Sequence, residues 1–230
     1  MNKDDVSIMV VPRASLFSGE ASQGFIPHAE HDYLSVILQK HAYMRRGDAE
    51  RNPAFKQPIP YAFIINPGIK TLFAYQRASK KEDAHEERLH GRWSLGVGGH
   101  IDNSDALLPL ESIMKLGVIW GKGDTALVKG LARELHEEVD IQGNILSVRL
   151  LGYINDDSDE VGRVHLGLVY AVKTNAFIVM HRGGEIVKSG MYSPLEIESL
   201  FSDTNSVVEN WSKIAGPPVL DAIFRNNLLF

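Results

Sequence analysis

Residues 133–138, Arg-Glu-Leu-His-Glu-Glu, place three carboxylates close together on a predicted helix. Glu134, Glu137 and Glu138 stand three and four positions apart, so their side chains project from one side of the helix. Like charges at these spacings repel by about 0.2–0.5 kcal/mol per pair, and a divalent cation would reverse that repulsion. The stretch therefore predicts a metal-binding face, with a plain acidic surface helix as the alternative.

The predicted ligand type indicates which metal would bind. Carboxylate oxygens, without Cys and without a His-Glu-x-x-His pair, suit Mg²⁺ or Mn²⁺ better than zinc, and Mg²⁺ commonly accompanies phosphate groups. The chain contains no Cys. This excludes a disulfide framework, thiol catalysis and zinc–thiolate sites.

The same stretch carries a family resemblance. Residues 133–139 (RELHEEV) resemble the core of the Nudix box, whose pattern is G-x5-E-x7-R-E-U-x-E-E-x-G-U with U aliphatic. Residues 93–101 (WSLGVGGHI) resemble the strand and Gly-Gly turn that open the box, with Gly99 as its first glycine. The resemblance implies an α/β fold, an α/β/α sandwich around a mixed β-sheet.

The chain departs from the pattern between the turn and the helix. Arg133 follows Gly99 by 34 residues, which predicts an insertion of 20 residues in the box, at about residues 103–122. The first Glu of the pattern is absent eight residues before Arg133, where Thr125 follows Asp124. Asp124 either replaces that Glu or caps the helix that begins there.

The resemblance also implies a reaction and a set of roles. The expected reaction is water attack on a phosphorus of a nucleoside diphosphate linked to another moiety, with Mg²⁺ or Mn²⁺ as cofactor. Glu137, Glu138 and the backbone carbonyl of Gly98 are the implied metal ligands. Glu134 is either a further ligand or the carboxylate that orients the water, and Arg133 is expected to hold a box carboxylate in position.

A further acid is expected from a loop after the box. Residues 155–160 (NDDSDE) form the acidic cluster placed to provide it, and Glu160 is the first choice for a general base. The alternative is a polar turn rich in Asp and Ser.

Other side chains are candidates for substrate contact. Arg77 and Arg92 are candidate phosphate ligands, because the guanidinium fork matches phosphate oxygens; surface charge is the alternative. His100, which directly follows the glycine turn, is a candidate for substrate binding or for a structural role. His165 is expected to be structural.

The chain is expected to form one domain over residues 1–230, since 230 residues with 44% hydrophobic content can bury a full core. Helical decoration is expected at about residues 18–58. Residue patterns predict strands at 6–12, 60–65, 70–77, 145–154 and 163–173, with the second and third forming a hairpin. They predict helices at 32–44, from 193 or 194, at 206–214 and at 218–224, the last two separated by residues 216–218 (GPP).

Three functional classes remain open. A Nudix hydrolase is favoured. An isopentenyl-diphosphate-isomerase type shares the box but relies on a catalytic Cys, which this chain lacks. A non-catalytic nucleotide-binding or regulatory module is compatible with the missing first Glu and the insertion, but no effector domain accompanies it.

Composition limits the partners. The net charge of −5 argues against a broad surface for duplex nucleic acid. The sequence lacks a secretion signal and an apolar run of about 18 residues, so a cytoplasmic protein without a membrane span is expected. The expected partner is a small nucleotide or other diphosphate, and a homodimer is an expectation at the level of the family.

Overall fold

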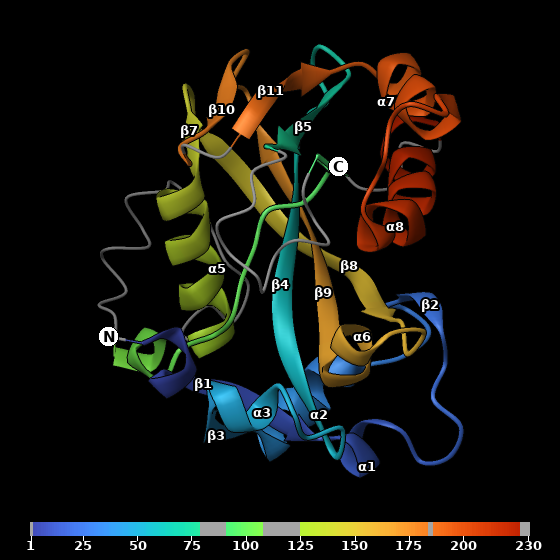
Figure 1. Cartoon of the computed structure of the whole chain (residues 1–230). Helices are drawn as coiled ribbons and strands as arrows, with labels where there is room; N and C mark the ends of the chain where they lie inside the picture. Colours follow the sequence, from blue (N-terminus) through green and yellow to red (C-terminus); the bar gives the residue numbers. More distant parts are fainter. Residues whose placement is uncertain (1, 79–90, 108–124, 184–185, 226–230) are drawn as a thin grey trace.

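Two long strands, β4 (Phe55–Asn66) and β9 (His165–Thr174), run parallel through the centre of the molecule. The computed structural model describes residues 2–78, 91–107, 125–183 and 186–225. The pairing of β4 with β9 runs from Gln57 opposite His165 to Ile65 opposite Lys173. Nearly every residue of both strands is buried, because the sheet is covered on both faces (Figure 1).

The other strands extend this pair into a mixed nine-stranded sheet. Its path is β11-β5-β4-β9-β8-β2, with β1 and β3 attached beside β4 and with β6 attached to β5. The bounds are β1 (Ser7–Pro12), β2 (Gly24–Pro27), β3 (Ala42–Arg45), β5 (Thr71–Arg77), β6 (Trp93–Ser94), β8 (Ile145–Asn155) and β11 (Ile186–Tyr192). A separate pair joins β7 (Val139–Ile141) to β10 (Val179–His181). The β4–β5 pairing confirms the predicted hairpin.

Helices cover both faces of the sheet, which confirms the α/β/α sandwich. Helix α5 (Ala126–Glu138) lies on one face, and α7 (Pro194–Ser202) and α8 (Asn210–Leu220) lie on the other (Figure 1). Alternate residues of a strand point to opposite faces. Ala62 and Ile64 of β4 therefore join the core under α5, whereas Phe63 and Ile65 join the core under α7 and α8.

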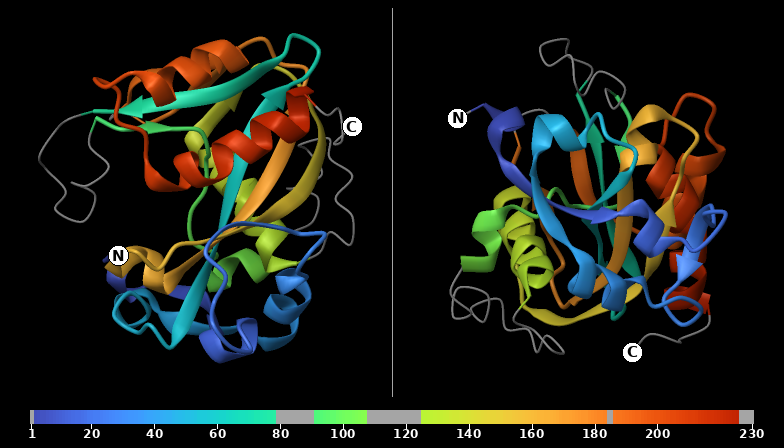
Figure 2. Two further views of the ribbon diagram at one scale, coloured as in Figure 1. Left: turned by 90° about the vertical axis from the view of Figure 1, so that its right-hand side faces the viewer. Right: turned by 90° about the horizontal axis from the view of Figure 1, so that it is seen from below.

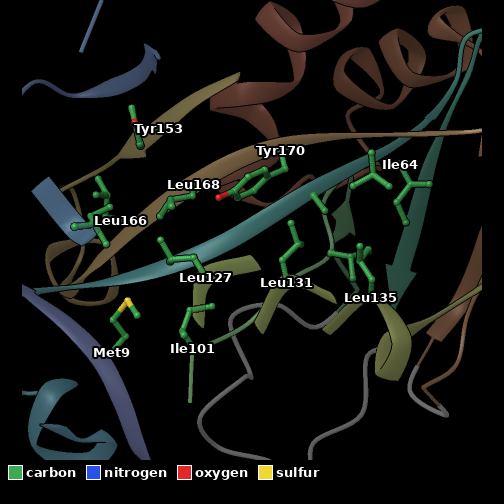
Figure 3. Close-up of a cluster of buried hydrophobic side chains, with 14 of the residues drawn as sticks. Met9, Ile64, Ile101, Leu127, Leu131, Leu135, Tyr153, Leu166, Leu168 and Tyr170 are labelled. Atoms are coloured by element: carbon green, nitrogen blue, oxygen red, sulfur yellow. The ribbon is translucent and has the colours of Figure 1, made fainter. Parts of the chain in front are cut away.

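Helix α5 is anchored by leucines at every fourth position. Leu127, Leu131 and Leu135 are almost fully buried and pack against Ile64 and Tyr170 in the same core (Figure 3). Burying one such leucine contributes about 1.5–3 kcal/mol. This apolar stripe fixes the rotation of α5 and hence the direction in which its carboxylates point.

The N-terminal elements gather at one end of the sheet (Figure 2). They include η1 (Lys3–Asp5), α1 (Arg13–Leu16), α2 (Tyr33–Lys40) and α3 (Arg46–Ala49), with β2 and β3 between the helices. The predicted helix at 32–44 ends at Lys40, because the residues after His41 pair with β1 as strand β3. The predicted helical decoration is therefore a mixture of helix and strand.

Two other predicted boundaries were wrong. Helix α6 (Glu160–Val164) occupies the start of the predicted strand 163–173, so β9 begins at His165. Helix α8 begins at Asn210 and continues through Pro217 and Pro218, where a break was predicted, and is followed by η4 (Asp221–Arg225). Residues Ala215, Gly216, Val219 and Leu220 of α8 are buried, so packing against the sheet outweighs the two missing N–H donors.

Part of the predicted box insertion lies outside the described residues. Residues 103–107 form the 3-10 helix η3 (Asn103–Leu107), and residues 108–122 are not described. Among the described helices, none combines the length and apolar character needed to cross a membrane.

An ion cluster around the buried Lys56 joins the N-terminal segment to the loop before α6. Lys56 is fully buried, and its Nζ donates to Asp157 Oδ1 at 2.8 Å and to the carbonyl oxygens of Gly162 and His165 at 2.8 and 3.1 Å. Arg13 pairs with the same carboxylate. Asp157, within the acidic cluster that was expected to supply a catalytic acid, is therefore committed to ion pairs.

Replacing Asp157 with Asn is expected to lower the free energy of unfolding by about 3–5 kcal/mol at pH 7, because Lys56 would lose its buried counter-charge. Burial raises the pKa of Asp157, but hydrogen bonds from Arg13 and Lys56 outweigh it and hold this pKa well below its usual value. The stabilisation is therefore present above the ordinary Asp pKa of about 3.9 and is lost as the pH falls below it. Urea denaturation at several pH values measures both effects.

The matched control is Asp48→Asn, since the Asp48 side chain is 58% exposed and makes only surface ion pairs. This change is expected to cost less than about 1 kcal/mol. Equal losses for the two variants would contradict a structural role for the Asp157 cluster.

Candidate functional site

The Gly98-Gly99 turn lies directly against α5. A Cβ atom on Gly98 would stand 1.7 Å from the carbonyl oxygen of Pro60, and one on Gly99 would stand 2.5 Å from Glu134 Oε1. Positive φ is not the reason for these glycines, because the positive-φ glycines of the described chain are Gly24 and Gly91. Close approach of the backbone to β4 and to the Glu134 carboxylate requires glycine at both positions.

Two of the three predicted carboxylates converge on one guanidinium nitrogen. Arg133 Nη1 donates to Glu134 Oε1 at 2.8 Å and to Glu137 Oε2 at 3.2 Å. Glu134 is buried, whereas the Glu137 side chain is 56% exposed. Arg133 therefore contacts two of the three carboxylates that were predicted to bind a metal.

Glu138 faces a different neighbour. Its Oε2 lies 3.9 Å from Nε2 of His181, at the end of β10. The His181 ring stacks at a tilt on Tyr75, with ring centroids 4.6 Å apart. Burial lowers the pKa of His181 to about 4, and the charge of Arg77 adds to this effect.

Asp105 is a site residue that the sequence reasoning missed. It is fully buried in η3, and it accepts from Arg133 Nε at 2.7 Å and from Arg133 Nη2 at 3.0 Å. Such a two-point Arg–carboxylate pair fixes the plane of the guanidinium. We call Asp105, Arg133, Glu134 and Glu137 the Arg133 network.

Asp105 also corrects the alignment of the box. It follows Gly99 by six residues, which is the place of the first Glu in G-x5-E. Thr125 instead caps α5 by accepting from the backbone N–H of Val128, and Asp124 lies outside the described residues. Counting forward from Gly99, and not backward from Arg133, would have identified the residue. Residues 103–107, where the predicted insertion begins, pack against α5 through Asp105 of η3.

The Arg133 network carries an excess of negative charge at a partly buried place. Burial raises the pKa of Glu134, Arg133 opposes this, and the charges of Glu137 and Asp102 add to it. A hard cation would relieve this repulsion, and carboxylate oxygens are the ligands that Mg²⁺ and Mn²⁺ prefer. The donors present at this face of α5 therefore fit such an ion.

The residues predicted to contact the substrate lie on two sides of the acidic face of α5, with His100 on one side and Arg77 and Arg92 on the other. Burial lowers the pKa of the His100 ring well below its ordinary value, and the charges of His165, Arg46 and Arg133 lower it further, so the ring is neutral. Its backbone carbonyl accepts from Arg133 Nη2 at 2.9 Å, while its Nε2 lies 2.7 Å from Gln57 Oε1.

Arg77 and Arg92 lie together near the Glu138 end of α5. The backbone N–H of Arg77 donates to the carbonyl of Arg92 at 3.0 Å, and Arg77 Nη2 donates to the Tyr75 hydroxyl at 3.2 Å. Tyr75 connects this pair to His181 and Glu138. Both arginines are half-buried, so neither is a fully exposed surface charge.

Glu160 stands apart from these groups. It is exposed at the first turn of α6, and none of the described hydrogen bonds or ion pairs joins its side chain to α5.

A second cluster of possible ligands, which we call the Glu–His–His group, consists of Glu50, His100 and His165, whose ligand atoms all lie within 4.8 Å of one another.

Comparisons with known proteins extend over most of the chain. No protein-family model matches it. Protein YmaB of Bacillus subtilis (strain 168) is 34% identical over 178 residues, which cover 75% of this chain and 78% of YmaB. The crystal structure of Tm1382, a proposed Nudix hydrolase, has a TM-score of 0.68 and 27% identity and covers 94% of this chain and 98% of its own. The likeness is therefore not confined to the box.

Replacing Asp105 with Ala is expected to lower the free energy of unfolding by about 3–5 kcal/mol, because it breaks a buried ion pair and leaves the Arg133 guanidinium without its two-point partner. Thr125→Ala, which removes only a helix cap, is expected to cost about 1 kcal/mol. Urea denaturation of the two variants measures the difference. A larger loss for Thr125→Ala would contradict the stabilising role of the Asp105–Arg133 pair.

Proposed function

The chain belongs to the Nudix hydrolase family, and from this premise we propose that it uses Mg²⁺ or Mn²⁺ to cleave a phosphoanhydride bond in a nucleoside diphosphate linked to another moiety. Members of the family act on acid anhydrides in phosphorus-containing compounds. The metal ion, the bond that is cleaved and the residues that act on the substrate are the parts proposed for this chain.

The observation that carries the proposal is the convergence of Glu134 and Glu137 on Arg133 beside the Gly98-Gly99 turn. Arg133 offsets only one of the three negative charges of Asp105, Glu134 and Glu137, so a divalent cation would offset the rest. The turn brings backbone carbonyl groups to the same place without a side chain in the way.

The metal would be held by Glu137, Glu138 and the carbonyl oxygen of Gly98, with Glu134 either a further ligand or the carboxylate that orients the water. When bound, such an ion neutralises charge on the phosphates and lowers the pKa of a bound water. Arg133 is a positioning residue in this arrangement, since it orients two of these carboxylates. Asp105 in turn orients Arg133.

Glu134 and Glu160 are the two candidates for the general base. Glu134 lies within the Arg133 network and its pKa is raised by burial, which brings a carboxylate closer to the operating pH of a base. Glu160 is the other candidate because of its position in the sequence, in the loop after the box. We expect Glu134→Gln to reduce turnover by about 10²–10⁴-fold and Glu160→Gln to reduce it far less.

Arg77, Arg92 and His100 are proposed to contact the substrate. The two arginines lie at the Glu138 end of α5, so they are placed to bind phosphate oxygens beyond the metal-bound ones. His100 lies at the opposite side of the turn. A small nucleotide or other diphosphate would then span the face of α5 between them.

The alternatives are weaker. An isomerase of the isopentenyl-diphosphate type needs a catalytic Cys, and the chain has none. A non-catalytic module was suggested by a missing first acid, but Asp105 occupies that place. A cytoplasmic location and a homodimer remain proposals.

The first test measures phosphate or nucleotide release from a panel of nucleoside triphosphates, dinucleoside polyphosphates, NADH, ADP-ribose and nucleotide sugars, with Mg²⁺ or Mn²⁺. Turnover is expected in the wild type and is expected to fall by at least about 10²-fold in Glu137→Gln plus Glu138→Gln, more than the loss of one outer-shell partner costs. His136→Gln is the matched control, because His136 is exposed on the same helix turn. Metal-dependent nucleotide binding without any turnover would favour the non-catalytic module.

A second test uses the glycine turn. Gly99→Ala is expected to abolish most turnover, because the new Cβ would stand 2.5 Å from Glu134 Oε1 and displace that carboxylate. Overpacking is expected to cost about 1–3 kcal/mol of stability. Gly190→Ala in β11 is the control, since its Cβ would meet only Tyr192, at 3.8 Å. Full activity in Gly99→Ala would contradict the proposed role of the turn.

A further inference from the structure

We propose that the Glu–His–His group, Glu50, His100 and His165, is a second metal site that takes a late first-row transition ion, with Zn²⁺ favoured. The site is separate from the carboxylates of α5 and goes beyond the proposed hydrolase function, and it assigns the His100 ring to this ion in place of a substrate contact. Its three residues come from distant segments: the end of α3, the residue after the glycine turn and the first residue of β9.

The spacing of the ligand atoms fits a tetrahedral ion. Glu50 Oε1 lies 3.6 Å from His100 Nε2 and 3.9 Å from His165 Nε2, and the two Nε2 atoms lie 3.3 Å apart. Bonds of about 2.0–2.1 Å at tetrahedral angles separate neighbouring ligand atoms by about 3.3–3.4 Å, whereas octahedral angles separate them by about 2.9 Å. Shifts of a few tenths of an ångström would complete the site.

The tautomer of His165 is the one that a metal ligand needs. Its Nδ1 lies 2.8 Å from the carbonyl oxygen of Val161. A carbonyl oxygen only accepts, so Nδ1 carries the hydrogen and Nε2 presents its lone pair to Glu50 and His100. Metal-bound histidines are commonly oriented by such a bond to a backbone carbonyl.

Three acceptors face Nε2 of His100. They are Gln57 Oε1 at 2.7 Å, Nε2 of His165 at 3.3 Å and the Glu50 carboxylate at 3.6 Å, and one ring nitrogen carries at most one hydrogen. Arg46 lies beside Glu50, with Nε 3.5 Å from Oε1. A cation bound between the two imidazoles and the carboxylate would take one lone pair from each of these three groups.

Gln57 borders the same group. It is fully buried next to His100, and within the described residues its amide nitrogen has no hydrogen-bond partner. An N–H donor is satisfied by an acceptor and not by a cation, so this nitrogen indicates an ordered water molecule beside the group. A water molecule is the expected fourth ligand of the proposed ion.

The donor set selects the ion. Two imidazoles with one carboxylate suit zinc, whereas Mg²⁺ prefers oxygen ligands alone. The side chains of Glu50, His100 and His165 are 30%, 15% and 9% exposed, so an ion can enter from solvent. Bound there, it would hold the N-terminal segment against the residue that follows Gly99, whose carbonyl accepts from Arg133.

The test uses the full chain, stripped of metal with a chelator and titrated with Zn²⁺ and with Co²⁺ in excess Mg²⁺. Wild type is expected to bind one equivalent of Zn²⁺ tightly, to give the visible spectrum of tetrahedral Co²⁺, and to melt at a higher temperature with Zn²⁺. Glu137→Gln plus Glu138→Gln is expected to keep all three properties, even though it loses turnover. This variant separates the second site from the proposed catalytic one.

His165→Ala and Glu50→Gln are expected to weaken Zn²⁺ binding by at least about 10²-fold and to abolish the Co²⁺ spectrum. Glu50→Gln keeps the shape of the side chain, so it guards against simple misfolding. His31→Ala is the control, because His31 is an exposed histidine of the N-terminal segment. Failure of the wild type to bind Zn²⁺, loss of binding only in the α5 variant, or an octahedral Co²⁺ spectrum would each overturn the proposal.

Discussion

The guanidinium of Arg133 is the interaction on which the arrangement of the site depends. It bonds at once to Asp105, Glu134, Glu137 and the carbonyl of His100. One planar cation therefore joins η3, the glycine turn and α5. Without it, three carboxylates would face one another in a partly buried place, and their mutual repulsion would push them apart.

The sheet makes this arrangement possible because it presents α5 at a fixed depth and rotation. Leu127, Leu131 and Leu135 bind the helix to one face of β4 and β9 through a continuous apolar core. The carboxylates then point to the place where the segment before Gly98 pairs with β4 through the Ala62–Val97 bridge. The same helical periodicity therefore sets both the apolar stripe of α5, which packs on the sheet, and its acidic side, which forms the site.

Two kinds of ligand chemistry lie on either side of the Gly-Gly turn. Oxygen donors gather on α5, where a hard ion is proposed, and nitrogen donors gather around His100, where a softer ion is proposed. The backbone of His100 contacts the first group while its side chain belongs to the second. An ion at the second site would therefore restrain the backbone that carries the first.

The sequence by itself determined the features that depend on local periodicity. These include the acidic side of α5, the β4–β5 hairpin, the strand near 145–154, most of the strand predicted at 163–173, and the start of α7 at Ser193 or Pro194. Spacing along a helix or strand dictates which side chains share a face, so such features need no knowledge of the rest of the chain. Helix α8 is the exception, because burial of its apolar face carries it through two prolines.

Only the tertiary structure decided which distant side chains meet. Asp105 reaches Arg133 across 28 residues, and His165 reaches His100 across 65. Asp157, which the sequence placed in a candidate catalytic loop, meets Lys56 and Arg13 in an ion cluster around the buried Lys56. Contacts of this kind arise when β4 and β9 pair and the N-terminal segment closes over their ends. The G-x5-E spacing marks Asp105, but no local pattern states which side chain each of these residues meets, because that geometry exists only once the sheet has formed.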